Sequence, residues 1–246
     1  MNAALAIASR EFVRTLRQPA ALGATLLTPI MVWVLFSGGL AGAFAEGTAA
    51  ESLIPGAALL VVLFGSLYAG MTLADERERA FVRTLTAEGV SPASIASGKL
   101  FAGAALSCAQ AMLVVVLISL ASGSFDLSAL PGVLCVLLLA SFAAGGVSAG
   151  LACFARTSRA LHWLTNLVLM PAWLLSGALF PLDGAAGWVR ATATVNPAAW
   201  AHAALVPVFE SGPMSWTSLG LVATAAAGGV ALAIVGIARG IGSRAD

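Results

Sequence analysis

Ser148 has the surroundings in this sequence that most resemble a catalytic motif. It is the centre of GVSAG, Gly146–Gly150, which matches the Gly-x-Ser-x-Gly pattern of hydrolase nucleophiles. That pattern works at a turn from a strand into a helix, and the serine needs a base to take its proton. The two histidines of the chain, His162 and His202, lie in other segments. We therefore predict that the two glycines form a close-packing face for another helix and that Ser148 bonds its own backbone.

Metal and nucleotide chemistry have weaker support in the sequence. Three cysteines lie in apolar runs without a Cys-x-x-Cys pair, which favours small packing residues over a metal or redox site. These are Cys108, Cys135 and Cys153. Gly98-Lys99 resembles the end of a phosphate-binding loop, but Ala93 replaces the first glycine of that motif and Leu100 its Ser/Thr. We therefore predict no catalytic residue, no metal and no cofactor bound by this chain.

The composition indicates which solvent surrounds most side chains. Hydrophobic residues make up 60% of the 246 residues and charged residues 9%, whereas soluble domains carry roughly half and about 25%. One water-soluble core cannot bury so many apolar side chains, so lipid must surround them. The formal net charge of +1 shows no basic excess, and we expect no nucleic-acid partner.

Six stretches without Lys, Arg, Asp or Glu are long enough to cross a bilayer, for which a helix needs ~20 residues. Their residues do not alternate as those of membrane-spanning strands do. We predict an all-α integral membrane protein with a single transmembrane domain over residues 1–246. Its six transmembrane helices are expected at 22–44, 53–74, 100–122, 131–155, 160–180 and 217–238.

The Lys and Arg residues indicate the orientation of these helices. Eleven of the twelve lie in the N-terminal segment, in 75–99, between the fourth and fifth helices, or near the C-terminus; the other is Arg190. Positive residues concentrate on the cytoplasmic side, so we expect a multi-pass protein of the cytoplasmic (inner) membrane with both termini and loop 75–99 in the cytoplasm. Residues 41–46 resemble a signal-peptide cleavage site, but the apolar stretch before them exceeds the ~7–15 residues of a signal peptide.

The segment before the first span, 1–19, has the pattern of an amphipathic interfacial helix. On a helical wheel, Leu5, Phe12 and Leu16 fall together, and the basic residues cluster opposite. These are Arg10, Arg14 and Arg17. Such a helix lies along the membrane with its basic face toward lipid phosphates or a partner. A basic tail that only sets topology is the alternative.

After the fifth span, 181–210 is too apolar for a free loop. Asp183 and Asn196 resemble helix N-caps, which predicts short helices over Gly184–Thr194 and Pro197–Val208. We predict that this outer re-entrant segment forms a gate in the outer leaflet, with a solvated loop as the alternative. The candidate gate residues are Phe180, Pro181, Trp188, Asn196, Pro197 and Trp200.

The polar side chains inside the spans are uncharged, which suits a large amphipathic or apolar cargo better than a small ion. The candidate path-lining residues are Ser66, Tyr68, Thr72, Thr165, Asn166 and Trp173. Gln110 on the third span belongs to the same uncharged group. Hydrogen bonds between helices are the alternative role for these groups.

The order of these features resembles the permease subunits of ATP-binding-cassette exporters, type-2 permease family, over essentially the whole chain. The loop DERERAFVRTLTAEGVSPASIASGK carries the acidic-basic start, Thr-Leu, Ser-Pro and Gly-Lys elements of that family. These are Glu76–Arg79, Thr84-Leu85, Ser91-Pro92 and Gly98-Lys99. The later block carries Ser176-Gly177, Phe180-Pro181 and Asn196-Pro197. Arg83 departs from the glycine that the family often has before Thr-Leu.

The resemblance implies that loop 75–99 carries a coupling helix that docks on a separate ATP-binding-cassette ATPase subunit, which binds ATP and Mg. The expected contact residues are Glu76, Arg77, Glu78, Arg79, Phe81, Val82, Arg83, Leu85 and Glu88. The family pairs two copies, or a copy and a paralogue, and the second and fifth helices line the path between them. A topology-setting charge cluster is the alternative for the loop. A non-catalytic membrane scaffold or assembly factor, and a rhomboid-like intramembrane serine protease, are the alternatives for the protein.

Overall fold

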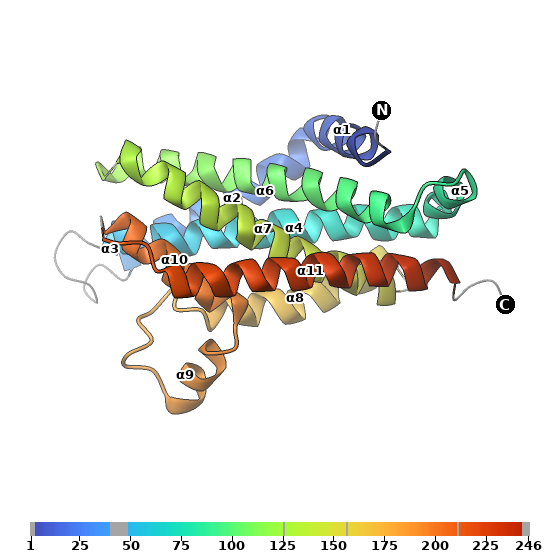
Figure 1. The fold of residues 1–246 in the computed structure, drawn as a ribbon. Coiled ribbons are helices and arrows are strands. Elements are labelled where there is room, and N and C mark those ends of the chain that lie inside the picture. The colour runs from blue at the N-terminus through green and yellow to red at the C-terminus, as the bar shows by residue number, and fades with distance from the viewer. Residues whose placement is uncertain (1–2, 40–48, 125, 156, 211, 243–246) are drawn as a thin grey trace.

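The protein is described from a computed structural model, over residues 3–39, 49–124, 126–155, 157–210 and 212–242. In this part of the chain the regular structure is entirely helical, as predicted (Figure 1). The helices are α1 (Ala3–Leu16), α2 (Pro19–Gly39), α3 (Ala49–Ser52), α4 (Ile54–Glu78), α5 (Phe81–Ala87), α6 (Pro92–Ser122), η2 (Leu127–Ala129), α7 (Leu130–Phe154), α8 (Ser158–Leu174), α9 (Gly187–Ala193), α10 (Pro197–Phe209) and α11 (Trp216–Gly242).

Five of these helices are long and apolar enough to cross a membrane, namely α2, α4, α6, α7 and α11. The remaining predicted span, the fifth at 160–180, is helical only up to Leu174, where α8 ends. At 1.5 Å per residue its 17 residues reach about 25 Å, less than the ~30 Å of hydrocarbon. A turn with Gly177 at φ +90° follows, which is a conformation that glycine adopts without strain.

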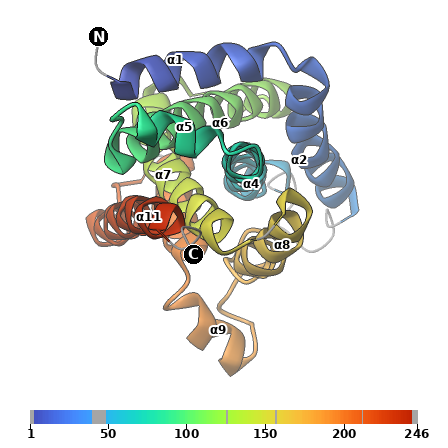
Figure 2. The same ribbon diagram turned by 90° about the vertical axis from the view of Figure 1, so that its right-hand side faces the viewer.

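Helix α4 lies at the centre of the bundle, with α6, α7, α8 and α2 around it (Figure 2). Its apolar residues form much of the core at both ends of the bundle, including Ile54, Leu60 and Leu73. Helix α2, in contrast, lies at the periphery, because only 6% of residues 22–39 are buried. The outward side chains of α2 must therefore meet lipid or another protein.

Helices α7 and α11 approach so closely that there is no room for a side chain at two glycines of α7. A Cβ added to Gly146 of α7 would lie 2.2 Å from the backbone of Gly229 on α11. A Cβ on Gly150 would lie 2.5 Å from Leu232 of α11. The prediction that Gly146 and Gly150 form a helix-packing face is therefore confirmed.

The structure corrects the bounds of the charged loop. Helix α4 continues to Glu78 and α6 already begins at Pro92, so the connection is short and contains the small helix α5. Ser91 caps α6 by accepting a hydrogen bond from the Ser94 amide at 3.2 Å. Glu76 and Lys99, expected at the ends of a water-exposed loop, are buried. Helices α4 and α6 can extend over these charged residues because the charges pair with one another, as described below.

Both ends of the bundle carry short helices. Helix α5 and the end of α11 lie at one end, and α3, α9 and α10 lie at the other (Figure 1). Helix α1 runs across the bundle rather than along it (Figure 2), as an interfacial helix would. Asn196 caps α10 as predicted, accepting from the Ala198 amide at 3.0 Å. The predicted cap at Asp183 is wrong, because α9 begins only at Gly187 with Ala186 before it.

Candidate functional site

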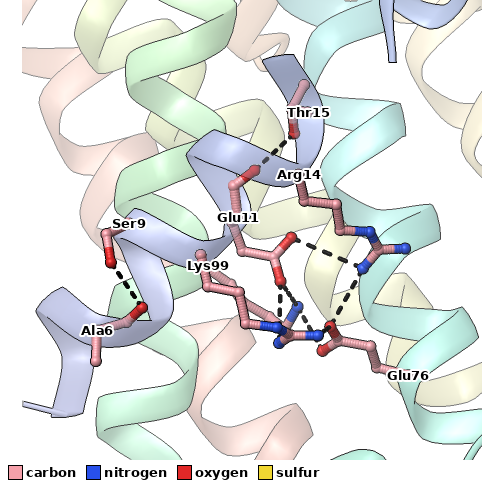
Figure 3. A network of polar contacts seen from close by, with 8 residues as sticks. Ala6, Ser9, Glu11, Arg14, Thr15, Glu76 and Lys99 are labelled. Carbon is pink, nitrogen blue, oxygen red and sulfur yellow. Dashed lines mark hydrogen bonds and ion pairs between the residues drawn. The ribbon is translucent and has the colours of Figure 1, made fainter. Parts of the chain in front are cut away.

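Lys99, near the start of α6, lies between two carboxylates (Figure 3). Its Nζ is 2.9 Å from Oε1 of Glu11 on α1 and 2.7 Å from Oε2 of Glu76 on α4. The second oxygen of Glu76 accepts hydrogen bonds from Arg10 at 2.9 Å and from Arg14 at 3.2 Å. Five charged side chains from three helices therefore meet at one place, which we call the charge cluster.

Three members of the charge cluster are shielded from solvent. The side chains of Lys99, Glu11 and Glu76 are 7%, 8% and 5% exposed, whereas Arg10 and Arg14 are only partly covered. An isolated buried charge costs several kcal/mol, and a well-placed opposite charge offsets most of that cost. Three cations face two anions here, so the buried charges are compensated and the surplus positive charge lies at the exposed arginines.

The charge cluster also contacts helix α5. The guanidinium of Arg10 lies over the ring of Phe81, 4.3 Å from its centre, in a cation–π arrangement. The next residue, Val82, is buried in the same apolar cluster as Ile7 of α1 and Leu73 of α4. Helices α1, α4 and α6 are thus joined by ion pairs, and α5 is joined to them by the cation–π contact and by apolar packing.

The remaining charges at the end of α4 bind the connection between α7 and α8. Asp75 and Glu78 accept hydrogen bonds from the Ser158 hydroxyl, and Glu78 also accepts from the Ser158 amide at 2.6 Å. Arg77 donates to the carbonyl of Ala152 at the end of α7. The run of five charges from Asp75 to Arg79 therefore has a structural use, because four of them tie α4 to neighbouring segments.

The residues predicted to contact an ATPase differ in how far they are exposed. Arg79, Arg83 and Glu88 are exposed on and beside α5. Glu76 and Val82 are buried in the bundle, so they are not accessible to a partner protein in this structure. Phe81 and Leu85 are partly buried. Sequence reasoning missed Glu11, the single acid of the basic N-terminal segment, and gave Lys99, the single lysine, no part in a pair.

The candidate path-lining residues do not share one surface. Ser66 and Thr72 are buried within the bundle, and the side chain of Tyr68 lies outside the described residues. Trp173 is also buried, and its indole donates to the Gly56 carbonyl at 2.8 Å, which ties α8 to α4. Gln110 donates to Thr25 of α2 at 3.0 Å. Hydrogen bonding between helices was the alternative role for these polar groups. The structure shows it for Gln110 and, among the candidate path-lining residues, for Trp173.

Two further path candidates lie on α8. Thr165 is fully buried and its hydroxyl has no hydrogen-bond partner among the described residues. The next residue is Asn166, whose Nδ2 lies 3.1 Å from Nε2 of His162. Both residues border a small cavity between α4 and α8.

Two of the six candidate gate residues, Asn196 and Trp200, donate side-chain hydrogen bonds to backbone carbonyls. Asn196 donates to the Ala172 carbonyl of α8 at 2.6 Å while capping α10. The Trp200 indole donates to the Thr194 carbonyl at 3.0 Å. Phe180, Pro181, Trp188 and Pro197 are exposed. A gate role for these residues stays a prediction. The hydrogen bond from Asn196 fixes the start of α10 against α8.

Ser148 is fully buried, and its Oγ faces Gly70 of α4. That oxygen makes no hydrogen bond within the described residues, so the predicted bond to its own backbone is wrong. His202 packs beside Gly177, and burial lowers the pKa of its imidazole to about 4. His162 lies beside Asn166. Neither histidine is a hydrogen-bond partner of the Ser148 Oγ, which argues against a serine protease.

Comparison with known proteins agrees with this arrangement. A family model described as "ABC-2 type transporter" matches residues 2–209. The chain is 26% identical over 220 residues to a protein of Porphyra purpurea named "Putative transport permease ycf38". The match covers 86% of this chain and 75% of that protein.

Proposed function

Because the chain belongs to the ABC-2 type transporter family and is a multi-pass transport permease rather than an enzyme, we propose that it is the membrane-spanning subunit of an ATP-driven exporter. In this proposal a separate ATP-binding-cassette ATPase binds ATP and Mg and supplies the driving force. The observation that carries the proposal is the charge cluster with α5 packed against it. This unit presents charged residues outward while it is joined inward to α1, α4 and α6.

The proposed coupling works by displacement of α5. The ATPase contacts the exposed charges Arg79, Arg83 and Glu88, and its two nucleotide states hold α5 in two positions. A partner that bound both positions equally could move nothing, so the contact must differ between the states. Because Phe81 lies against Arg10 and Val82 is buried against α1 and α4, the displacement reaches α4 directly.

The proposed path lies between two copies of the chain, or between the chain and a paralogue. The side of the bundle formed by α2 and α8 carries strongly exposed apolar residues, including Trp163 at 72% and Leu167 at 73%. Phe64 and Met71 of α4 are partly exposed, seven residues apart on one helix face. A second copy on this side would place the two α4 helices opposite each other. The uncharged lining suits an amphipathic cargo.

The coupling proposal is tested by reversing exposed charges without touching the core. We expect the double variant Arg79→Glu/Glu88→Arg to lose co-purification with the ATPase and transport into reconstituted vesicles. Glu51→Arg is the matched control, since it reverses an exposed charge on α3, at the other end of the bundle. Thermal unfolding of all three proteins should be alike, because surface changes usually shift stability by less than ~0.5 kcal/mol. Normal ATPase binding by the double variant would show that α5 is not the contact.

A further inference from the structure

A large apolar cavity between α8 and α11 points to a ligand that the proposed function does not include. Its volume is about 440 Å³, within the ~300–1,000 Å³ range of small-molecule sites. Helices α4 and α7 form its floor and α10 covers its outer end. Exposed residues of α8 and α11, among them Val168, Gly228 and Leu232, stand at its border. The cavity therefore opens sideways, between α8 and α11.

The lining can recognise only an apolar group. None of the residues around the cavity carries a charge, and most are Ala, Gly, Val or Leu. The side-chain donors of its polar members, Asn196, Trp200 and Thr224, already bond carbonyls within the chain. No polar occupant would find a matching partner, and an apolar cavity excludes water. An empty cavity of this size would forfeit the dispersion contacts of its walls.

We propose that this cavity binds one acyl chain of a membrane phospholipid, which enters from the outer half of the bilayer. The short helix α9 projects from the outer end of the bundle on the side of α8 and α11 (Figures 1 and 2). It carries Arg190, an exposed cation that suits a lipid phosphate, and the exposed Trp188, which suits the membrane interface. The projection of α9 also prevents a second copy from packing flat against this side.

The acyl chain has a structural consequence for α10. With the cavity filled, the chain contacts Leu63 of α4 and Val147 of α7 on one side and Ala198 and Trp200 of α10 on the other, which line the cavity and are only partly buried. The bound acyl chain then packs against α10 and stabilises its position, in addition to the hydrogen bond from Asn196 to α8. This inference does not depend on an ATPase partner and applies to the chain alone. Only the assignment of the leaflet depends on the orientation expected from the basic residues.

The test uses the full chain in phosphatidylcholine vesicles that contain phosphatidylcholine with a photoreactive diazirine in mid-chain. The residues to monitor are Leu63 of α4 and Val147 of α7, which lie on the floor of the cavity and are only partly buried. Adducts on these residues, found by mass spectrometry after illumination, would show an inserted chain. We expect Gly228→Leu to lower this labelling about tenfold, because a Cβ there meets open space and the leucine fills the cavity.

Gly220→Leu is the matched control, because Gly220 lies on the same helix, also faces open space and does not line the cavity. It should leave the labelling of Leu63 and Val147 unchanged. Equal labelling in both variants, or none in the unaltered chain, would overturn the proposal. So would reaction of Thr224→Cys with an impermeant water-soluble maleimide, which would mean an aqueous cavity. A disulfide between two Thr224→Cys copies would mean that a second copy occupies the site.

Discussion

The ammonium of Lys99 joins carboxylates from helices that are far apart in the chain, since Glu11 precedes it by 88 residues. Burial of one cation and two anions is costly, and the cluster is stable only because each charge has a close partner. An apolar set of similar shape could hold the same helices together. The ion pairs instead fix one registration of α1 on α4 and α6, because a shifted α1 would leave Glu76 and Lys99 with incomplete pairing.

Lys99→Met should therefore destabilise the protein by about 3–5 kcal/mol, the usual cost when one partner of a buried pair is removed. The loss arises because the carboxyl groups of Glu11 and Glu76 lose the cation that lies between them. Unfolding titrations in detergent micelles would measure it. The double variant Lys99→Met/Glu76→Gln should lose less than the sum of the single variants, by roughly 0.5–3 kcal/mol.

Arg17→Met is the control for this series, because Arg17 is an exposed cation at the end of α1. It should change the free energy of unfolding by less than ~0.5 kcal/mol. If Lys99→Met were equally mild, the cluster would contribute nothing to stability and the observed distances would have no energetic meaning. Additive losses in the double variant would contradict direct coupling between Lys99 and Glu76.

At the scale of elements, the close contact of α7 with α11 follows from sequence and the ends of the helices do not. Small residues four apart predict close packing of membrane helices, and Gly146 and Gly150 confirm it. The rule that a span ends where charge begins fails for α4 and α6, because Glu76 and Lys99 neutralise each other inside the fold. No local pattern reveals a partner on another helix.

Gly146→Ala should loosen α7 from α11. The added Cβ would lie 2.2 Å from the Gly229 backbone, and forced overpacking of this kind costs about 1–3 kcal/mol or more. Gly145→Ala is the neighbouring control, because its Cβ would meet Leu100 at an ordinary 3.7 Å. Thermal unfolding in detergent should separate the two variants clearly. Equal melting temperatures would mean that the helices adjust without cost and that Gly146 is not a packing requirement.

At the scale of the whole molecule, the sequence predicts the class of the protein because long apolar stretches can be satisfied only in a bilayer. The helical bundle and the family confirm that part. The candidate site was predicted only in part. The charged loop was located, whereas the inward place of Val82 and the part of α1 in the site depend on contacts between distant segments. The uneven basic residues predict which end faces the cytoplasm, and that orientation stays a prediction.

The orientation is tested with single cysteines at opposite ends of the bundle, in a chain whose Cys108, Cys135 and Cys153 are replaced by Ala. Glu88 and Asp183 are both exposed, one after α5 and one before α9. An impermeant maleimide added to intact cells should label Asp183→Cys and spare Glu88→Cys until the cells are opened. The reason is that transfer of basic segments across the membrane is disfavoured, and the basic residues gather at the α5 end. Labelling of Glu88→Cys in intact cells would place α5 outside, where no ATP-driven partner could reach it.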